Sequence, residues 1–320
     1  MKLKDFYSRV IEAGIANDLR GAAAVAALLG EEKARFDKLP EGDRADFDPD
    51  RLFNPFSDTR ILTGDPETEV RTVIAGIDMD VAELLLAHLL KRDGGRPIDL
   101  VISHHPQGRA LSRLYDVMRL QADLLASCGV TLSVAEKLME KRIDEVERRL
   151  MPVNHNRTVD AARLLGLPLM CIHTAADNCV TSFLTRLFER EKPAKLKDVV
   201  SLLKTLPEYR KAVSLQVPPK IVSGSEDSRC GVIFVDMTGG TEGSKESLEK
   251  LAAGGVSTLV GMHISEDHLE NARKANVNVV IAGHISSDAL GLNLLLDAVE
   301  KEERFEFVCT SGFDRVRRTG

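Results

Sequence analysis

Short apolar runs alternate with amphipathic stretches along most of this 320-residue chain. Runs rich in Val, Ile and Leu predict buried strands at residues 70–77, 98–102, 169–172, 231–235, 257–260, 277–282 and 305–309. Helical spacing of apolar residues predicts helices at 5–29, 81–92, 111–150 (with a break near Cys128 and Gly129), 156–166, 181–207 (with a break at Pro193), 243–253, 267–275 and 289–301. Strand–helix–strand alternation implies parallel pairing with right-handed crossovers, and therefore an α/β protein.

Two parts of the chain lack this alternation. Residues 31–66 are polar and carry four prolines, so they are interpreted as a long surface connection. Residues 209–219 and the Gly/Ser-rich turn at 223–228 are interpreted as loop or edge strand. No repeat of fixed period is found. A chain of this length predicts one large or two medium α/β domains.

Three of the predicted strands end in histidine. The run Pro97-Ile-Asp-Leu-Val-Ile-Ser ends at His104 and His105, and two later runs end at His173 and His284. Imidazole is the commonest transition-metal ligand among side chains, and ligands gather outside the carboxyl ends of parallel strands. His173 and His284 are each followed four residues later by an aspartate, which shares a face with the histidine if a helix begins there. The candidate ligands from this pattern are the histidines His104, His105, His173 and His284 and the carboxylates Asp177 and Asp288.

Each pattern also has an explanation without a metal. The His-His-Pro sequence could be a turn whose rings cap backbone carbonyls, and either His-x-x-x-Asp could be a hydrogen bond at a helix start. The recurrence of three similar strand ends favours a shared metal site over these separate explanations. The other histidines are interpreted differently: His155, His263 and His268 as structural or surface residues, and His88 as packed in a helix.

Composition excludes several classes of protein. The chain is 43% hydrophobic and 29% charged, as an ordinary globular protein is. Its net charge of −6, without a dense Lys/Arg stripe, argues against nucleic-acid binding, and the absence of Trp argues against a base-stacking platform. The N-terminus lacks a secretory apolar region, and no stretch is long and apolar enough to span a membrane, so we expect a cytoplasmic protein. Five scattered cysteines without a CxxC pair argue against disulfides or a cysteine-ligated zinc site.

The three histidine-bearing strand ends also carry a family resemblance. The chain resembles the Ngg-one-interacting-factor-three-like family, the YbgI/YqfO-type dinuclear metal proteins, sometimes called GTP cyclohydrolase I type two. The likeness extends upstream through residues 54–64 and 76–80, and downstream through 236–240 and 261–272. It therefore covers most of the chain.

The resemblance implies a fold and a set of roles. It implies two three-layer α/β units with mixed, largely parallel sheets, in which N- and C-terminal segments combine. The unit that bears the metal ligands would consist of residues 1–170 plus 270–320, and the second unit of residues 171–269. It implies two divalent transition-metal ions (zinc, iron or manganese) and a homo-oligomer, commonly a ring-like hexamer. The implied roles are His104 and His105 as ligands of different ions, Asp177 as a shared carboxylate, His284 as a terminal ligand, Asp288 as a second bridging carboxylate and His173 as a neighbour of the metals.

The chain departs from the family pattern in three places. The family usually has Glu where this chain has Asp288, whose side chain is one methylene shorter. After Asp177 the chain reads Asn-Cys-Val-Thr-Ser, where the family tends to be rich in glycine. The spacing from His105 to His173 is longer than usual, so residues 118–154 are interpreted as an inserted helical segment.

A two-metal site predicts hydrolysis, because paired ions lower the pKa of a bound water and polarise a carbonyl or phosphoryl oxygen. Phosphoesters, amides and rings such as purines are candidate substrates, with His173 as a proton shuttle and Glu266 as a weaker candidate. No GxxxxGK[ST] or suitably placed GxGxxG supports a nucleotide, so GTP is implied by the resemblance only. The alternative function is a non-enzymatic metal-binding scaffold, chaperone or partner-binding regulator.

A glycine-rich stretch follows the predicted strand at 231–235. Thr238-Gly-Gly-Thr-Glu-Gly243 lies between this strand and the next predicted helix. Such a position suits a loop that cradles an anion, and it also suits a plain glycine turn.

Overall fold

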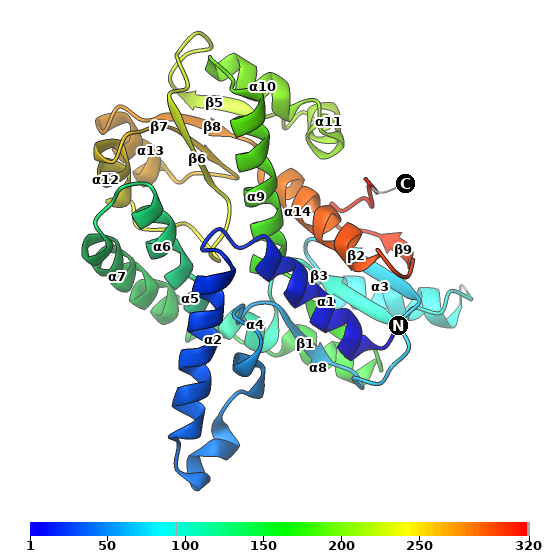
Figure 1. Cartoon of the computed structure of the whole chain (residues 1–320). Coiled ribbons are helices and arrows are strands. Elements are labelled where there is room, and N and C mark those ends of the chain that lie inside the picture. The colour runs from blue at the N-terminus through cyan, green and yellow to red at the C-terminus, as the bar shows by residue number, and fades with distance from the viewer. Residues whose placement is uncertain (94, 319–320) are drawn as a thin grey trace.

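Two β-sheets form the framework of the protein in a computed structural model that describes residues 1–93 and 95–318 (Figure 1). The first sheet has the strand order β1-β4-β3-β2-β9. Its strands are β1 (Arg60–Thr63), β2 (Thr72–Gly76), β3 (Leu100–Ser103), β4 (Leu169–Cys171) and β9 (Glu306–Cys309). Edge strand β1 is antiparallel to β4, and the other pairs are parallel.

The second sheet repeats the topology of the first. Its order is β5-β8-β7-β6, with β5 (Lys220–Ser223), β6 (Val232–Asp236), β7 (Val256–Gly261) and β8 (Asn278–Ile281). Edge strand β5 is antiparallel to β8, and the other pairs are parallel. Both antiparallel edges carry a register shift at the same place, between Ile61 and Thr63 and between Ile221 and Ser223. The chain thus contains two copies of one four-stranded arrangement, which the sequence patterns do not reveal.

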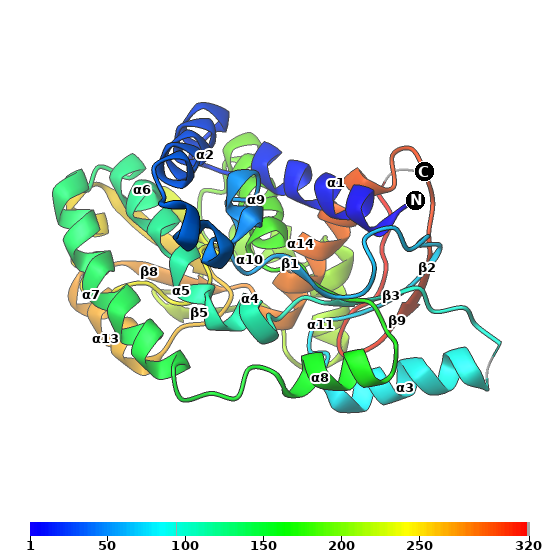
Figure 2. The same ribbon diagram turned by 90° about the horizontal axis from the view of Figure 1, so that it is seen from below.

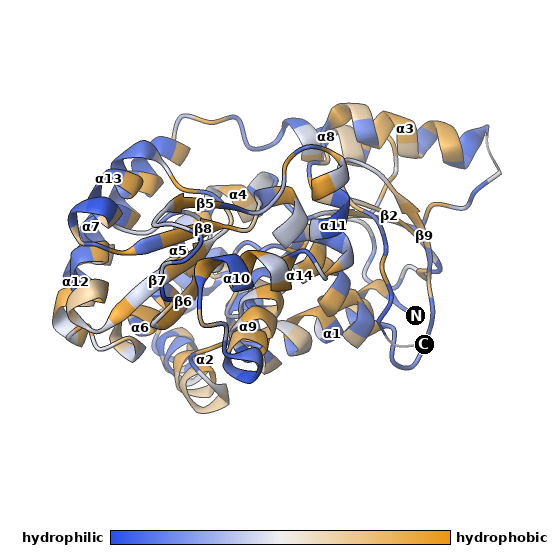
Figure 3. Cartoon of the chain, turned by 90° about the horizontal axis from the view of Figure 1, so that it is seen from above, coloured by the Kyte–Doolittle hydropathy of each residue, from blue (hydrophilic) through white to orange (hydrophobic). Residues whose placement is uncertain are grey.

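Two long helices lie between the sheets. Figures 1 and 2 show α9 (Thr174–Glu191) and α14 (His284–Val299) side by side in the centre of the molecule. Helix α14 is apolar on most of its sides (Figure 3), as expected of a helix that is buried all round. Ala175 of α9 and Leu292 of α14 pack in the core of the first sheet, whereas Val180 and Leu290 pack in the core of the second.

Most of the remaining helices cover the outer faces of the two sheets, and α1 (Leu3–Ala16) lies in the layer between them. Helices α3 (Val81–Arg92) and α8 (Arg157–Leu164) pack on the outer face of the first sheet. Helices α7 (Leu132–Leu150), α12 (Ser247–Ala253) and α13 (Glu266–Lys274) pack on the outer face of the second sheet. The other helices are α4 (Gly108–Ser112), α5 (Leu114–Val117), α6 (Arg119–Ser127), α10 (Leu196–Leu203) and α11 (Pro207–Ser214).

These layers confirm the predicted fold class of two three-layer α/β units with mixed, largely parallel sheets. The units share their central layer of helices. The two ends of the chain combine as expected, because β9 pairs with β2 and the amino group of Met1 donates a hydrogen bond to Glu303. The division into 1–170 plus 270–320 and 171–269 stays a prediction.

Several predicted elements differ from the structure. Helix α9 begins at Thr174 rather than at 181, and α14 begins at His284 rather than at 289. Residues 209–219 do not form loop or edge strand throughout, because α11 starts at Pro207 and covers 209–214, where it buries the side chain of Tyr209. The predicted surface connection at 31–66 contains part of α2 (Ala22–Asp37), the 3-10 helices η1 (Glu41–Asp46) and η2 (Pro49–Leu52), and β1.

Helix α2 projects from the rest of the molecule (Figure 1). Val25 is its one buried residue. In contrast, the segment interpreted as an insertion packs closely: α6 and α7 lie against each other, and Met139 and Ile143 of α7 contribute to the core of the second sheet. Within the described ranges, no helix is long and apolar enough to cross a membrane.

Candidate metal centre

The histidines predicted as ligands lie together where strands of both sheets end. His104 and His105 follow β3, His173 follows β4, and His284 follows β8. The ring centroids of His104 and His173 are 5.0 Å apart, those of His104 and His105 5.4 Å, and those of His105 and His284 5.1 Å. The carboxyl edges of the two sheets therefore deliver one cluster of imidazoles.

Asp288 lies between the paired histidines of β3. Its Oδ1 atom is 3.5 Å from Nε2 of His104, and its Oδ2 atom is 3.4 Å from Nε2 of His105. The three side chains offer ligand atoms that all lie within 4.8 Å of one another. The shorter side chain of aspartate thus reaches both histidines from the second turn of α14.

A second group shares His104. Asp177 places Oδ1 3.5 Å from Nε2 of His104 and Oδ2 3.8 Å from Nε2 of His173. Ligand atoms of His104, His173 and Asp177 also lie within 4.8 Å of one another. The structure therefore brings His173 as close to the cluster as a ligand would be, although the resemblance implies only a neighbour.

His284 lies at the open side of the cluster. Its Nε2 atom is 3.6 Å from Oδ2 of Asp288, and its side chain is 42% exposed, whereas that of Asp288 is 1% exposed. Both helix starts have the form expected from the sequence: a histidine at the strand end and an aspartate one turn later on the same side. The arrangement leaves His284 accessible from solvent while the carboxylates are buried.

The clustered atoms lack hydrogen-bond partners. Among the described residues, buried side-chain atoms without a partner belong to His104, Asp177 and Asp288 of the cluster, and otherwise to His155 and Arg315. A buried polar atom without a partner costs about 1–3 kcal/mol. Unpartnered imidazole nitrogen and carboxylate oxygens that converge form a donor set suited to zinc, iron or manganese, so the residues fit the implied ions.

The spacing of these atoms also fits a shared cation. Ligand atoms about 2.0–2.1 Å from a tetrahedral zinc ion lie about 3.3 Å from each other. The separations of 3.4 and 3.5 Å from Asp288 to His105 and His104 are close to that value. Direct hydrogen bonds between these groups would be shorter, at about 2.7–2.9 Å.

Each of three histidines is oriented through its other ring nitrogen. The Nδ1 atom of His104 bonds to the carbonyl oxygen of Ile172 at 2.9 Å, that of His105 to Asp78 at 2.6 Å, and that of His173 to Asp58 at 2.8 Å. Carbonyl and carboxylate oxygens only accept, so Nδ1 carries the hydrogen in each ring. In the neutral ring, Nε2 then presents its lone pair to the cluster. Metal-bound histidines typically donate their other ring N–H to a carboxylate or carbonyl oxygen in this way.

Asp58 also positions the start of α9. It accepts hydrogen bonds from Nδ1 of His173 and from the hydroxyl of Thr174, the latter at 2.6 Å. The backbone N–H of His173 donates to the hydroxyl of Thr59 at 3.1 Å. The helix therefore begins directly after the strand, which places Asp177 beside His173.

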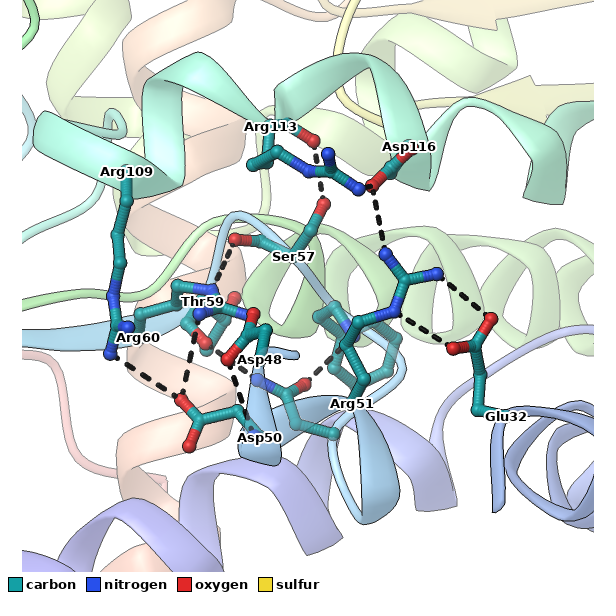
Figure 4. Close-up of polar contacts among 12 residues, drawn as sticks. Glu32, Asp48, Asp50, Arg51, Ser57, Thr59, Arg60, Arg109, Arg113 and Asp116 are labelled. Atoms are coloured by element: carbon teal, nitrogen blue, oxygen red, sulfur yellow. Dashed lines mark hydrogen bonds and ion pairs between the residues drawn. The ribbon is translucent and has the colours of Figure 1, made fainter. Parts of the chain in front are cut away.

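A polar network holds the turn that carries Asp58 (Figure 4). Arg60, whose side chain is 2% exposed, donates to the carbonyl oxygen of Ser57 at 2.8 Å and pairs with Asp48 and Asp50. The hydroxyl of Ser57 donates to the carbonyl oxygen of Arg113 at 2.7 Å. Asp48 and Asp50 before β1 and Arg113 after α4 thus hold the turn at 57–60 from two sides.

Burial and mutual charge shift the pKa values of the clustered groups. Burial, together with Asp288 and Asp58, raises the pKa of Asp177 to about 8. Burial would also raise the pKa of Asp288, but the paired histidines outweigh it and hold that pKa well below its usual range. Burial lowers the pKa of His104 and of His284 and so favours their neutral, metal-binding forms.

A cleft opens beside the cluster. One wall consists of His173, Asp177, His284 and Asp288, and the other of the segment 236–244 with His263. Because β6 ends at Asp236 and β7 at Gly261, this second wall comes from the carboxyl edge of the second sheet. The cluster thus faces a cleft between the carboxyl edges of the two sheets.

The glycine-rich segment 238–243 forms a tight loop at this wall. Gly239 and Gly240 have φ angles of 95° and 87°, which favour glycine. The side chain of Gln121 donates to the carbonyl oxygens of Gly239 and Thr241 at 2.9 and 2.7 Å, and Arg142 donates to that of Glu242 at 3.0 Å. The helices interpreted as an insertion therefore hold this loop in place.

Three further residues considered from the sequence lie at the cleft or away from it. His268 bonds to Ser265 and to the carbonyl oxygen of Gly243, so it supports the loop. His263 lines the cleft, with its ring 4.9 Å from that of His284, although it was expected to be structural or a surface residue. Glu266 is exposed on α13 and is not among the cleft-lining residues.

Three carboxylates near the cluster were missed by the sequence analysis. Asp58 and Asp78 support His173 and His105, and Glu242 faces His263 across 3.7 Å. All three lie in turns, where no periodic pattern marks them. Two of them lie in segments that carry the family resemblance, Asp58 in 54–64 and Asp78 in 76–80, and Glu242 lies in the glycine-rich segment 238–243. These positions were the available signal.

Known structures resemble this chain along most of its length. A NIF3 superfamily protein from Sphaerobacter thermophilus is 29% identical and covers 80% of this chain and 92% of its own, with a TM-score of 0.71. Reduced HcgD from Methanocaldococcus jannaschii is 14% identical, covers 82% of this chain and 93% of its own, and has a TM-score of 0.52, which supports the fold alone. No protein-family model matches the chain. No curated protein matches it either.

Proposed function

We propose that this chain, a NIF3-like protein, binds two divalent transition-metal ions and uses them to hydrolyse a small substrate. NIF3 is the abbreviation for the Ngg-one-interacting-factor-three family.

The observation that carries the proposal is the convergence of unpartnered buried atoms. Nε2 of His104, Oδ1 of Asp177 and both carboxylate oxygens of Asp288 meet without any hydrogen bond. Two buried carboxylates this close are unfavourable unless cations compensate them. A pair of divalent ions would satisfy all of these atoms at once.

The two groups of ligand atoms suggest how the ions are shared. His105 and Asp288 would hold one ion, Asp177 would hold the other, and the central position of His104 lets it serve either. His284 would complete the ligand set of the ion at the open side of the cluster. Zinc, iron and manganese all accept this mixture of nitrogen and oxygen ligands.

The bound ions would activate a water molecule and polarise the bond that it attacks. The residues of the chain would do the rest. Asp58 holds His173 by its Nδ1 atom, so the Nε2 atom faces the cleft and can take up or release a proton there. Burial would lower the pKa of His173, but the carboxylates of Asp177 and Asp58 outweigh it and raise that pKa to about 9.

A turnover assay tests the enzymatic part of the proposal. Metal-loaded protein is offered panels of phosphoesters, linear amides and cyclic amides, and the His105→Ala variant serves as the metal-depleted comparison. We expect turnover of at least one class, lost in His105→Ala and retained in His88→Ala, which changes a histidine of α3 outside the cluster.

The same assay addresses the alternative function. If the protein retains two ions but turns over nothing across broad panels, a metal-binding scaffold, chaperone or regulatory protein explains the site better than a hydrolase. The cytoplasmic location and the homo-oligomeric, hexameric assembly are also part of the proposal, since a ring of subunits would suit either function.

A further inference from the structure

We propose that the cleft beside the metal centre admits uncharged ring substrates, of the cyclic amide or heterocycle class, and excludes nucleoside polyphosphates. This inference rests on the proposed function, because it assumes that two divalent ions occupy the cluster. It goes further by deriving the substrate class from the charges and side chains of the opposite wall.

Four carboxylates surround the cleft. Asp177 and Asp288 lie on the metal side, and Asp236 and Glu242 lie on the opposite wall. Metal-bound carboxylates are ionised. Together the four offset the formal charge of two divalent ions, so the loaded cleft has no surplus of positive charge.

The opposite wall keeps its negative charge at neutral pH. Burial would raise the pKa of Glu242, but contacts with His263 and with the N–H of Ser265 hold it at about 2. The N–H of Ser265 donates to this carboxylate at 2.7 Å. Burial raises the pKa of Asp236 to about 6, which still leaves it largely ionised at pH 7. A cationic His263 would offset Glu242 alone, leaving Asp236 uncompensated.

No lysine or arginine is found among the described residues that line the cleft. The cations near the loop, Lys141, Arg142, Arg149 and Lys245, line an adjoining surface cleft that shares residues 242–244 and His268 with this one. Arg142 and Lys245 pair there with Glu145 and Asp267. Proteins that bind polyphosphates use lysine, arginine and backbone N–H groups to neutralise them. A triphosphate in this cleft would meet carboxylates instead.

The side chains of the wall suit a neutral ring. Met237, Met262 and Ile264 offer apolar surface, and Met262 and Ile264 are partly exposed. The hydroxyl of Thr241 and the ring of His263 add groups that can bond to a carbonyl oxygen or an N–H. Apolar walls with a few polar groups are typical of sites for small uncharged molecules.

Hydrolysis of a cyclic amide follows from this placement. The oxygen of water bonds to the carbonyl carbon, the ring C–N bond breaks, and one proton of the water is transferred to the released nitrogen. The product is an amino acid or ureido acid, whose new carboxylate would meet Asp236 and Glu242 across the cleft. Repulsion between these like charges favours release of the product.

Calorimetric binding to the metal-loaded protein tests the inference independently of turnover. The probes are dihydrouracil, hydantoin and guanosine as uncharged rings, and GTP as the polyphosphate partner of guanosine. We expect at least one ring to bind, and GTP to bind no more tightly than guanosine. GTP binding at least tenfold tighter than guanosine would overturn the inference, as would the absence of binding by every ring.

A charge-removing variant sharpens the test. At low ionic strength, Glu242→Gln should strengthen GTP binding by about threefold or more, because one repelling charge at the wall is lost. Glu246→Gln is the matched control, since this exposed glutamate belongs to the same loop region but does not line the cleft. Equal effects in the two variants, or no effect in either, would contradict the charge argument.

Metal content of the same samples separates the two proposals. Protein that carries two ions yet prefers GTP refutes the substrate class and leaves the metal centre intact. Protein that carries no ions after reconstitution refutes the proposed function itself.

Discussion

The Nε2 atom of His104 lies 3.5 Å from Oδ1 of Asp288, and neither atom has a hydrogen-bond partner. The two side chains come from different sheets, because His104 follows β3 and Asp288 lies in the helix that follows β8. Such close, unpaired approach is unfavourable by itself and becomes favourable with a cation between the groups.

Asp177 should make the metal-free protein less stable as the pH rises. Its pKa is raised from 3.8 to about 8 in the folded chain, so the folded state binds a proton more tightly than the unfolded state does. Stability then falls between about pH 4 and pH 8. Asp177→Asn should flatten this slope and raise the Tm of the metal-free protein near pH 8, by about 2–4 °C per kcal/mol of unfolding free energy gained.

Thermal denaturation of chelator-treated protein across this pH range gives the answer. Identical slopes for the native protein and Asp177→Asn would contradict the burial of an uncompensated carboxylate. Added metal at a hundredfold excess over Kd should stabilise the native protein by about 2.7 kcal/mol and raise its Tm. The Tm of Asp177→Asn should not rise.

Asp58 should matter for metal affinity although it lies outside the cluster. It holds His173 at 2.8 Å and Thr174 at 2.6 Å, so its removal frees the ring and the first turn of α9. We expect Asp58→Ala to weaken metal binding by about 10–100-fold, as loss of a supporting contact typically does. Titration with a metal-buffered indicator measures the change, and Asp43→Ala at an exposed position of η1 is the control. Equal affinities in the two variants would refute the supporting role.

The contact between α9 and α14 should limit the position of both aspartates. A Cβ atom on Gly291 would lie 2.5 Å from the carbonyl oxygen of Ala176, next to Asp177 and one turn from Asp288. Gly291→Ala should therefore cost about 1–3 kcal/mol of unfolding free energy and weaken metal binding. Gly30→Ala in α2, where a Cβ meets open space, should instead stabilise by about 0.5–1 kcal/mol. Urea denaturation distinguishes the opposite signs, and stabilisation by both substitutions would contradict the close packing.

Glu300 should fasten the C-terminal segment in a pH-dependent manner. It accepts hydrogen bonds from Arg315, Arg317 and the N–H of Phe305 at 2.6–3.0 Å. Burial would raise its pKa, but these donors outweigh burial and lower it. Its contribution is therefore complete above the ordinary value of 4.5 and is lost as the pH falls through the lowered pKa.

Glu300→Gln should destabilise the protein by about 1–3 kcal/mol at pH 7, because buried Arg315 keeps its contact with Asp297 but loses the charge of Glu300. The difference from the native protein should shrink below pH 4.5. Glu140→Gln, at an exposed position of α7, should change stability by less than about 0.5 kcal/mol at either pH. A difference that grows on acidification would have the wrong sign for this ion pair.

The sequence was sufficient to predict the α/β class because short apolar runs alternate with amphipathic stretches along most of the chain. Alternating runs and amphipathic stretches predicted the parallel strands and the α/β class, which the two sheets confirm. Edge strands β1 and β5 were missed, since each has four residues, is only partly buried and pairs on one side. Their pairing with β4 and β8 depends on distant parts of the chain, which local patterns do not contain.

The internal repeat was also hidden. Its visible trace is the recurrence of His-x-x-x-Asp at 173–177 and 284–288, each directly after an inner strand. The two copies differ in length, because the first carries α6 and α7 between β3 and β4. A search for a fixed period therefore does not find them.

The candidate ligands could be predicted because strand ends and helix starts have local signatures. His104, His105 and the two His-x-x-x-Asp pairs do converge, even though both helices begin earlier than their apolar pattern suggests. The supporting carboxylates Asp58 and Asp78 could not be predicted, because they reach the histidines from turns that are brought close only by the folded sheet. Their identification as ligand supports, like the ligand roles themselves, is a proposal that metal analysis decides.

Elemental analysis of the purified chain tests the central claim most directly. The native protein, reconstituted with zinc, iron or manganese and dialysed, should retain two ions per chain, and His105→Ala and Asp177→Ala should each lose them while His88→Ala keeps both. Unchanged metal content in both cluster variants, or no bound metal in the native protein, would contradict a dinuclear centre at His104, His105, Asp177, His284 and Asp288.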